Sequence, residues 1–120
     1  MANRWYGVTV DCVNPDRLAS FWGSLLGREL GDEMDEPGWA TVGSRHDPDP
    51  RITFQQVSEP KAGKVRLHLD IAVDDIEEAI AQVERLGGTA TGERHDYDEG
   101  VVVVMADPEG HEFCLVQYHD

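Results

Sequence analysis

One histidine in this sequence lies between charged residues in a pattern that could support acid–base chemistry. His68 stands two residues after Arg66 and two residues before Asp70. Because side chains alternate between the faces of a β-strand, a strand here places all three on one face. An imidazole beside a carboxylate can move a proton on a bound carbonyl or enolisable compound. The alternative is a strand histidine with only structural hydrogen bonds.

The N-terminal segment carries a second polar face. Residues 5–13 alternate in the same way, which places Thr9 and Asp11 on one side of a predicted strand. Asp11 is therefore a second carboxylate that could pair with His68, and we predict His68 and Asp11 as the catalytic pair. The opposite rows are apolar and are expected to pack under helices: Tyr6, Val8, Val10 and Cys12 in the first strand, and Leu67, Leu69, Ile71 and Val73 in the second.

A turn near the C-terminus predicts where the last strand begins. In Asp107-Pro108-Glu109-Gly110, proline fixes φ, aspartate accepts hydrogen bonds from the following backbone, and glycine supplies a positive φ. A strand is then expected over residues 112–118. Its alternation places Phe113 and Leu115 on the helix side, and Glu112, Cys114 and Val116 on the other side.

The chain also repeats one structural pattern. A strand over residues 5–13 leads to a helix with Asn14 as N-cap and Gly27 as its end, and a strand over 65–73 leads to a helix that begins at Asp74-Asp75 and ends at Gly87-Gly88. A shift of 61 residues places the first copy on the second. Further strands are predicted at 29–33, 39–43 and 51–57, and at 89–94, 101–106 and 112–118. We predict one domain, 1–120, with module 1 over about 1–59 and module 2 over about 64–120.

This layout resembles the vicinal oxygen chelate superfamily of glyoxalase, bleomycin-resistance and extradiol-dioxygenase relatives. The resemblance implies an α+β fold of two tandem βαβββ modules that form a curved mixed sheet, with helices outside and a ligand cavity inside. It also implies a small organic ligand or substrate. A homodimer is expected, because a second copy commonly covers open strand edges.

The same resemblance identifies four positions that match the superfamily's metal ligands: Gly7, Thr53, His68 and Cys114. Only His68 is a usual donor for an open divalent site, since glycine has no side chain, threonine is neutral and cysteine is a soft ligand. We therefore predict no cofactor and no usual metal site. Were a metal bound, it would be Ni, Mn, Fe or Zn held by His68 with Glu112 or Asp70.

The residues predicted to line the cavity are polar side chains on the inward faces, together with Trp5, Trp39 and Met105. Aromatic and thioether groups such as these suit packing against an organic ring. Several could instead be ordinary core or surface residues. The predicted ligand-binding set is Trp5, Thr9, Asp11, Trp39, Gln55, Arg66, His68, Asp70, Met105, Glu112 and Cys114.

Composition excludes several partners. With 24 acidic and 10 basic residues, the formal charge of −14 argues against nucleic acid and against anionic membrane surfaces. The N-terminus lacks an apolar signal core, and the longest apolar run, 101–106, is too short to span a membrane. We expect a cytoplasmic protein whose two cysteines, Cys12 and Cys114, are reduced.

Three functions remain open at this stage. The protein could sequester a small molecule, as proteins similar to bleomycin-resistance proteins do, and an acidic cavity would suit a cation. It could instead be a metal-free acid–base enzyme that uses His68 with Asp11, Asp70 or Glu112. A rearranged metal site with lyase, isomerase or dioxygenase chemistry is the third possibility. The residues do not identify the ligand.

Overall fold

The computed structural model describes residues 3–31 and 37–119, and the chain divides into two compact units, Met1–Pro60 and Lys61–Asp120. The division falls between the two modules that the sequence predicts, over about 1–59 and about 64–120. The acidic run 32–36 lies outside the described residues, and so does part of the strand predicted at 29–33. Within the described residues, no helix has the length and apolar character needed to cross a membrane.

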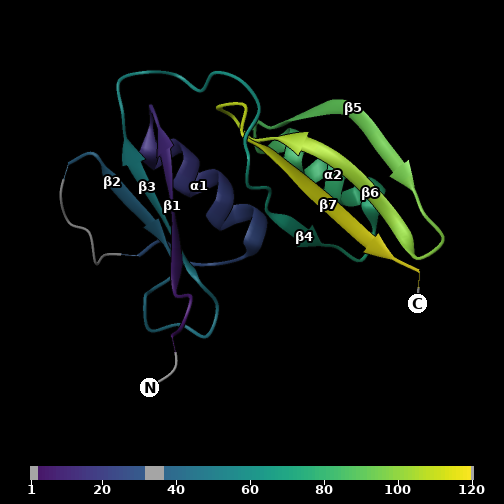
Figure 1. Ribbon diagram of the computed structural model, residues 1–120, viewed down its shortest axis with the longest axis horizontal. Helices are drawn as coiled ribbons and strands as arrows, with labels where there is room; N and C mark the ends of the chain where they lie inside the picture. Colours follow the sequence, from purple (N-terminus) through teal and green to yellow (C-terminus); the bar gives the residue numbers. More distant parts are fainter. Residues whose placement is uncertain (1–2, 32–36, 120) are drawn as a thin grey trace. The chain divides into compact units, whose positions relative to one another are not determined.

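The first unit contains a three-stranded mixed sheet and one helix (Figure 1). Its elements are β1 (Gly7–Cys12), α1 (Pro15–Leu26), β2 (Trp39–Val42) and β3 (Arg51–Gln56). The strand order is β1-β3-β2, with β1 parallel and β2 antiparallel to β3. Leu30 adds an isolated antiparallel bridge to Val42.

Helix α1 has the signals that its sequence predicts. The Asn14 side chain accepts a hydrogen bond from the Arg17 backbone N–H at 3.2 Å, and Pro15 occupies the first helical position. Gly27 ends the helix at φ 62°, in the left-handed region that glycine adopts without strain. Leu18 and Trp22 are buried on the helix face that packs on the sheet, together with Phe54 from β3.

The second unit contains a four-stranded mixed sheet with one helix on one face (Figure 1). Its elements are β4 (Asp70–Ala72), α2 (Ile76–Arg85), β5 (Thr89–Asp96), β6 (Gly100–Ala106) and β7 (Glu112–Tyr118). The order is β4-β7-β6-β5, with β4 parallel to β7 and the other pairs antiparallel. The Asp75 side chain caps α2, and the Gln117 side chain accepts a hydrogen bond from the Ile76 N–H at 2.8 Å. Gln117 therefore identifies the face of β7 that α2 covers.

The strand predicted over 65–73 is much shorter in the structure. Only Asp70–Ala72 is a strand, and Leu67, expected under a helix, is 84% exposed. The register explains the difference. Asp70 lies opposite Cys114 in a parallel pair, so residues before 68 would need partners upstream of Glu112, where β7 has not yet begun. Tyr6 likewise precedes β1 and is 49% exposed, contrary to its predicted place under α1.

The α+β class and the two tandem modules are confirmed, with a strand–helix–strand order in each unit. Both cysteines are free and buried. Strand β5 extends two residues beyond the predicted 89–94 and so includes His95. The curved sheet and the ligand cavity expected between the modules stay predictions.

Replacement of Trp22 by alanine tests the α1 core. Trp22 is 3% exposed and makes an edge-to-face contact with Phe21, at 5.3 Å between ring centroids. Trp22→Ala should lower the free energy of unfolding by about 3–5 kcal/mol, because it leaves a cavity under the helix. Ser20→Ala, on the exposed side of α1, is the matched control. Equal denaturant midpoints for the two variants would contradict this packing.

Candidate functional site

The sheet of the first unit has a polar face on the side opposite α1. Strand register places Thr53 beside Thr9 on β1 and beside Thr41 on β2. In the next row of the same face, Gln55 lies beside Asp11 and beside Trp39. Four of the predicted ligand-binding residues are therefore brought together: Thr9, Asp11, Trp39 and Gln55.

Thr41 belongs to this face and was not among the predicted residues. It is 2% exposed, and its Oγ1 has no hydrogen-bond partner within the described part of the chain. Its position two residues after Trp39 in the same strand was the signal that could have identified it. Trp5 lies before β1, is 69% exposed, and donates its indole N–H to the Gly7 carbonyl at 2.8 Å.

The second unit has an open face opposite α2. Across it, Asp70 on β4 lies beside Cys114 on β7, which lies beside Val104 on β6. Cys114 is 9% exposed, and burial is the largest cause that raises the pKa of its thiol. The Asp70 carboxylate raises this pKa further, by its charge and by a hydrogen bond with the thiol. Cys114 is therefore held as a neutral thiol, which is a poor nucleophile and a poor metal ligand.

A β-bulge in β5 brings Glu93 to the same site. The register of β5 against β6 shifts between Ala90 and Arg94, where Gly92 adopts φ 91°. The pKa of Glu93 is lowered, first by its contact with His95 at 2.7 Å and then by the charges of His95, Lys64 and His68. Glu93 was absent from the sequence prediction. The glycine inside a polar strand was the available signal, because it commonly marks a bulge.

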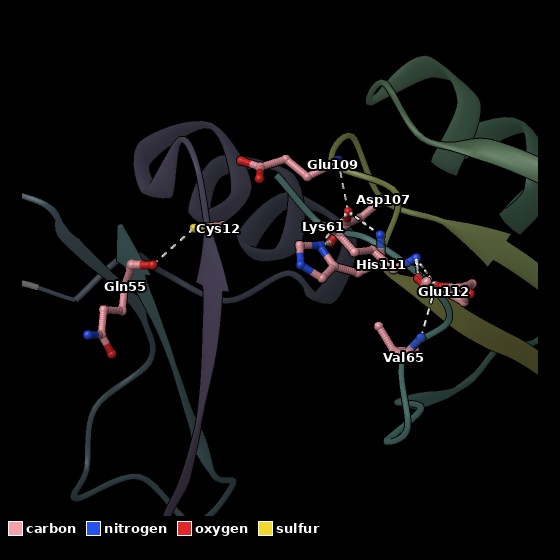
Figure 2. Close-up of polar contacts among 9 residues, drawn as sticks. Cys12, Gln55, Lys61, Val65, Asp107, Glu109, His111 and Glu112 are labelled. Atoms are coloured by element: carbon pink, nitrogen blue, oxygen red, sulfur yellow. Dashed lines mark hydrogen bonds and ion pairs between the residues drawn. The ribbon is translucent and has the colours of Figure 1, made fainter. Parts of the chain in front are cut away.

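Glu112 has a partner other than the predicted one. Its carboxylate forms an ion pair with Lys61 at 2.8 Å and lies 3.5 Å from the Val65 N–H (Figure 2). The hydrogen bond from Lys61 is the main cause that lowers the Glu112 pKa. The sequence prediction considered Glu112 as a carboxylate for His68, but the structure binds it to the segment that precedes β4.

The Asp107 turn positions the start of β7 as predicted. Asp107 is 3% exposed and accepts hydrogen bonds from the Glu109 N–H at 2.9 Å and the His111 N–H at 3.0 Å (Figure 2). Gly110 has φ 86°. The His111 ring also contacts Asp107 at 3.0 Å, and its side chain is only 15% exposed. His111 is therefore part of the turn.

Three other predicted residues lie in different surroundings. Met105 is fully buried opposite Phe113, on the α2 side of the sheet, so it is a core residue and does not line the open face. Arg66 and His68 are exposed in the irregular segment before β4. Asp11 belongs to the first unit and His68 to the second, and their pairing stays a prediction.

Comparison with known proteins gives a consistent result at the level of fold. Residues 7–116 match the family model described as a glyoxalase-like domain. A search of curated proteins gave no match. Because the structures below are less than 25% identical to this chain, their similarity shows the fold alone.

A glyoxalase/bleomycin resistance protein/dioxygenase family enzyme from Burkholderia phytofirmans PsJN has a TM-score of 0.81 and 14% identity, over 98% of this chain and 100% of that chain. The fosfomycin resistance protein FosX from Mesorhizobium loti has a TM-score of 0.73 and 15% identity, over 99% of this chain and 95% of that chain. The oxidase ChaP-H2 has a TM-score of 0.70 and 16% identity, over 99% of this chain and 96% of that chain.

The Lys61–Glu112 ion pair gives a pH-dependent contribution to stability. Because the folded-state pKa of Glu112 lies below its ordinary value of 4.5, the contribution is present above pH 4.5 and is lost as pH falls through the folded-state pKa. Glu112→Gln should therefore be less stable than the parent at neutral pH, with the difference narrowing in acid. Glu84→Gln, at an exposed site on α2, is the control for denaturation curves. A difference that is constant with pH would contradict the ion pair.

The raised pKa of Cys114 predicts that its thiol reacts slowly with disulfide reagents. In a Cys12→Ala background, Cys114 should react slowly with the disulfide reagent DTNB near neutral pH, because little thiolate is present. Asp70→Asn should speed the reaction severalfold and move its pH profile to lower pH, since it removes a charge that raises the thiol pKa. Asp74→Asn, an exposed carboxylate of the same unit, should change neither. Identical profiles for both variants would show that Asp70 does not act on the thiol.

Proposed function

This chain belongs to the family of glyoxalase-like domains, and from that premise we propose that it binds a small organic molecule on the polar open faces of its sheets. The observation that carries the proposal is the cluster on the second unit. Asp70 and Cys114 lie in register there, and the bulge brings in Glu93, which interacts with the charges of His68 and Lys64. Val104, which is 8% exposed, is the apolar neighbour of Cys114 in the same row. Convergent polar groups beside apolar surface are typical of small-molecule sites.

We further propose that binding does not use the divalent metal common in this superfamily. Gly7 offers no donor, and a Cβ there would lie 3.0 Å from the Arg51 carbonyl oxygen. Thr53 is a neutral hydroxyl, and Cys114 is held as a thiol by burial and by Asp70. Glu112, a carboxylate that could have replaced them, is bound to Lys61. These donors do not fit an open octahedral site for a divalent ion, which proteins commonly build from carboxylate and imidazole ligands.

A metal-free enzyme is the second candidate. His68 is exposed, and its charge interacts with that of Glu93, so an imidazole with a nearby carboxylate is available to a bound substrate. Such a pair could act as general acid and base on an enolisable carbonyl compound. The fold itself does not choose between the two candidates, since its structural neighbours include a resistance protein and an oxidase.

The proposal also covers the oligomeric state, the location and the partners of the protein. The proposal includes a homodimer in the cytoplasm and a small-molecule ligand, without nucleic acid or membrane. The net charge of −14 supports the last two exclusions.

Titration with ligands tests the proposal. Small carbonyl compounds and organic cations would be screened by thermal shift, and a hit titrated by calorimetry against the parent, His68→Ala and Asp11→Ala. Each variant should bind about tenfold more weakly with an unchanged melting temperature, because an exposed polar side chain is lost from the site and not from the core. His46→Ala, an exposed histidine of the first unit, should bind as the parent does.

Two results would contradict the proposal. Equal affinities for the parent, His68→Ala and Asp11→Ala would show that the ligand binds elsewhere. Elemental analysis of protein purified without chelator should give far less than one equivalent of Ni, Mn, Fe or Zn. A stoichiometric metal that His68→Ala removes would instead establish a rearranged metal site.

A further inference from the structure

Three exposed rings lie at the end of the second unit where the chain turns from β5 to β6. His95 and Tyr97 stack at 5.9 Å between ring centroids with an interplanar angle of 19°. Tyr97 is 54% exposed and Tyr118 is 57% exposed, while the His95 side chain is 43% exposed. We call His95, Tyr97 and Tyr118 the aromatic ledge. Exposed rings in one place are unusual unless they contact a ligand or a partner.

Strand register brings the ledge together. Tyr97 and Gly100 exchange backbone hydrogen bonds at 2.9 and 3.3 Å, and Gly100 lies opposite Tyr118 on β7. The His119 N–H also donates to the Glu99 carbonyl at 2.8 Å, so the turn and the end of β7 lie side by side (Figure 1). By strand alternation, both tyrosines point to the open side of the sheet, away from α2.

The residue between the two tyrosines has to be glycine. A Cβ on Gly100 would lie 2.5 Å from the Gln117 carbonyl oxygen, so no side chain is tolerated there. Since neighbouring strands are roughly 4.8 Å apart, the backbones of Tyr97 and Tyr118 are separated by roughly 10 Å. One planar ring can therefore reach both phenol rings, with no intervening side chain from the middle strand.

The turn beside the ledge carries exposed carboxylates. Glu93 contacts the His95 ring at 2.7 Å and holds it against Tyr97, and the exposed Asp98 and Glu99 form the adjoining turn. Ring faces attract cations, and acidic neighbours strengthen that attraction. We propose that the aromatic ledge binds a planar aromatic cation by stacking. None of the three rings belongs to the site of the proposed function, and only Glu93 is shared between the two.

Fluorescence titration with proflavine, a planar aromatic cation, tests the ledge. Tyr97→Leu and Tyr118→Leu should each weaken binding about threefold to tenfold, and the double variant by more, although no charge changes. Tyr97→Phe keeps the ring and should bind as the parent does. Tyr6→Leu, an exposed tyrosine of the first unit, is the matched control and should have no effect. Asp70→Asn, which alters the Asp70–Cys114 pair of the proposed function, should also leave proflavine binding unchanged.

Several outcomes would overturn the proposal. Equal affinity for the parent and the double variant, or an equal loss with Tyr6→Leu, would show that the rings do not form the site. If tetramethylammonium bound as tightly as proflavine, stacking of a planar ring would not contribute to binding. If the anionic dye anilinonaphthalene sulfonate bound as tightly, the site would not prefer cations. Proflavine affinity that falls as sedimentation shows dimer forming would mean that a second copy covers the ledge.

Discussion

The carboxylate of Asp107 determines where β7 begins, and the second unit is built around that strand. Its buried oxygens accept hydrogen bonds from the backbone of Glu109 and His111, so the turn cannot move without leaving these donors unsatisfied. Strand β7 then pairs with β4 on one side and β6 on the other, and carries Phe113 and Leu115 into the core under α2. The place of each residue on the open face depends on this start.

The same constraint shapes the chemistry of the open face. Because β7 starts at Glu112, that residue meets the chain entering β4 and becomes the partner of Lys61. Two residues later, Cys114 is placed opposite Asp70 and is held as a thiol. Side chains that would suit a metal or an acid–base pair are thus used in contacts within the unit. The imidazole and carboxylate that the proposed site uses are therefore His68 and Glu93, and the bulge places Glu93 on this face.

The two units show how one repeated module can carry different faces. Each places a helix on one side of a mixed sheet and polar residues on the other. In the first unit the open face has rows of threonine, amide and carboxylate side chains beside Trp39. In the second it carries carboxylates and imidazoles, with aromatic rings at one end. The fold requires only an apolar helix side, so the opposite side is free to vary.

The α+β class, the helix boundaries and the last strand could be predicted from the sequence, because caps, glycine stops and apolar periodicity are local properties. Asn14, Gly27 and the Asp107 turn each act within a few residues. Which side chains meet was decided by pairing between distant strands. Leu67 became exposed because β7 offers no partner there, Met105 became core because it lies opposite Phe113, and Glu93 reached the site through a bulge. Register is a property of two strands, and only the tertiary structure contains both.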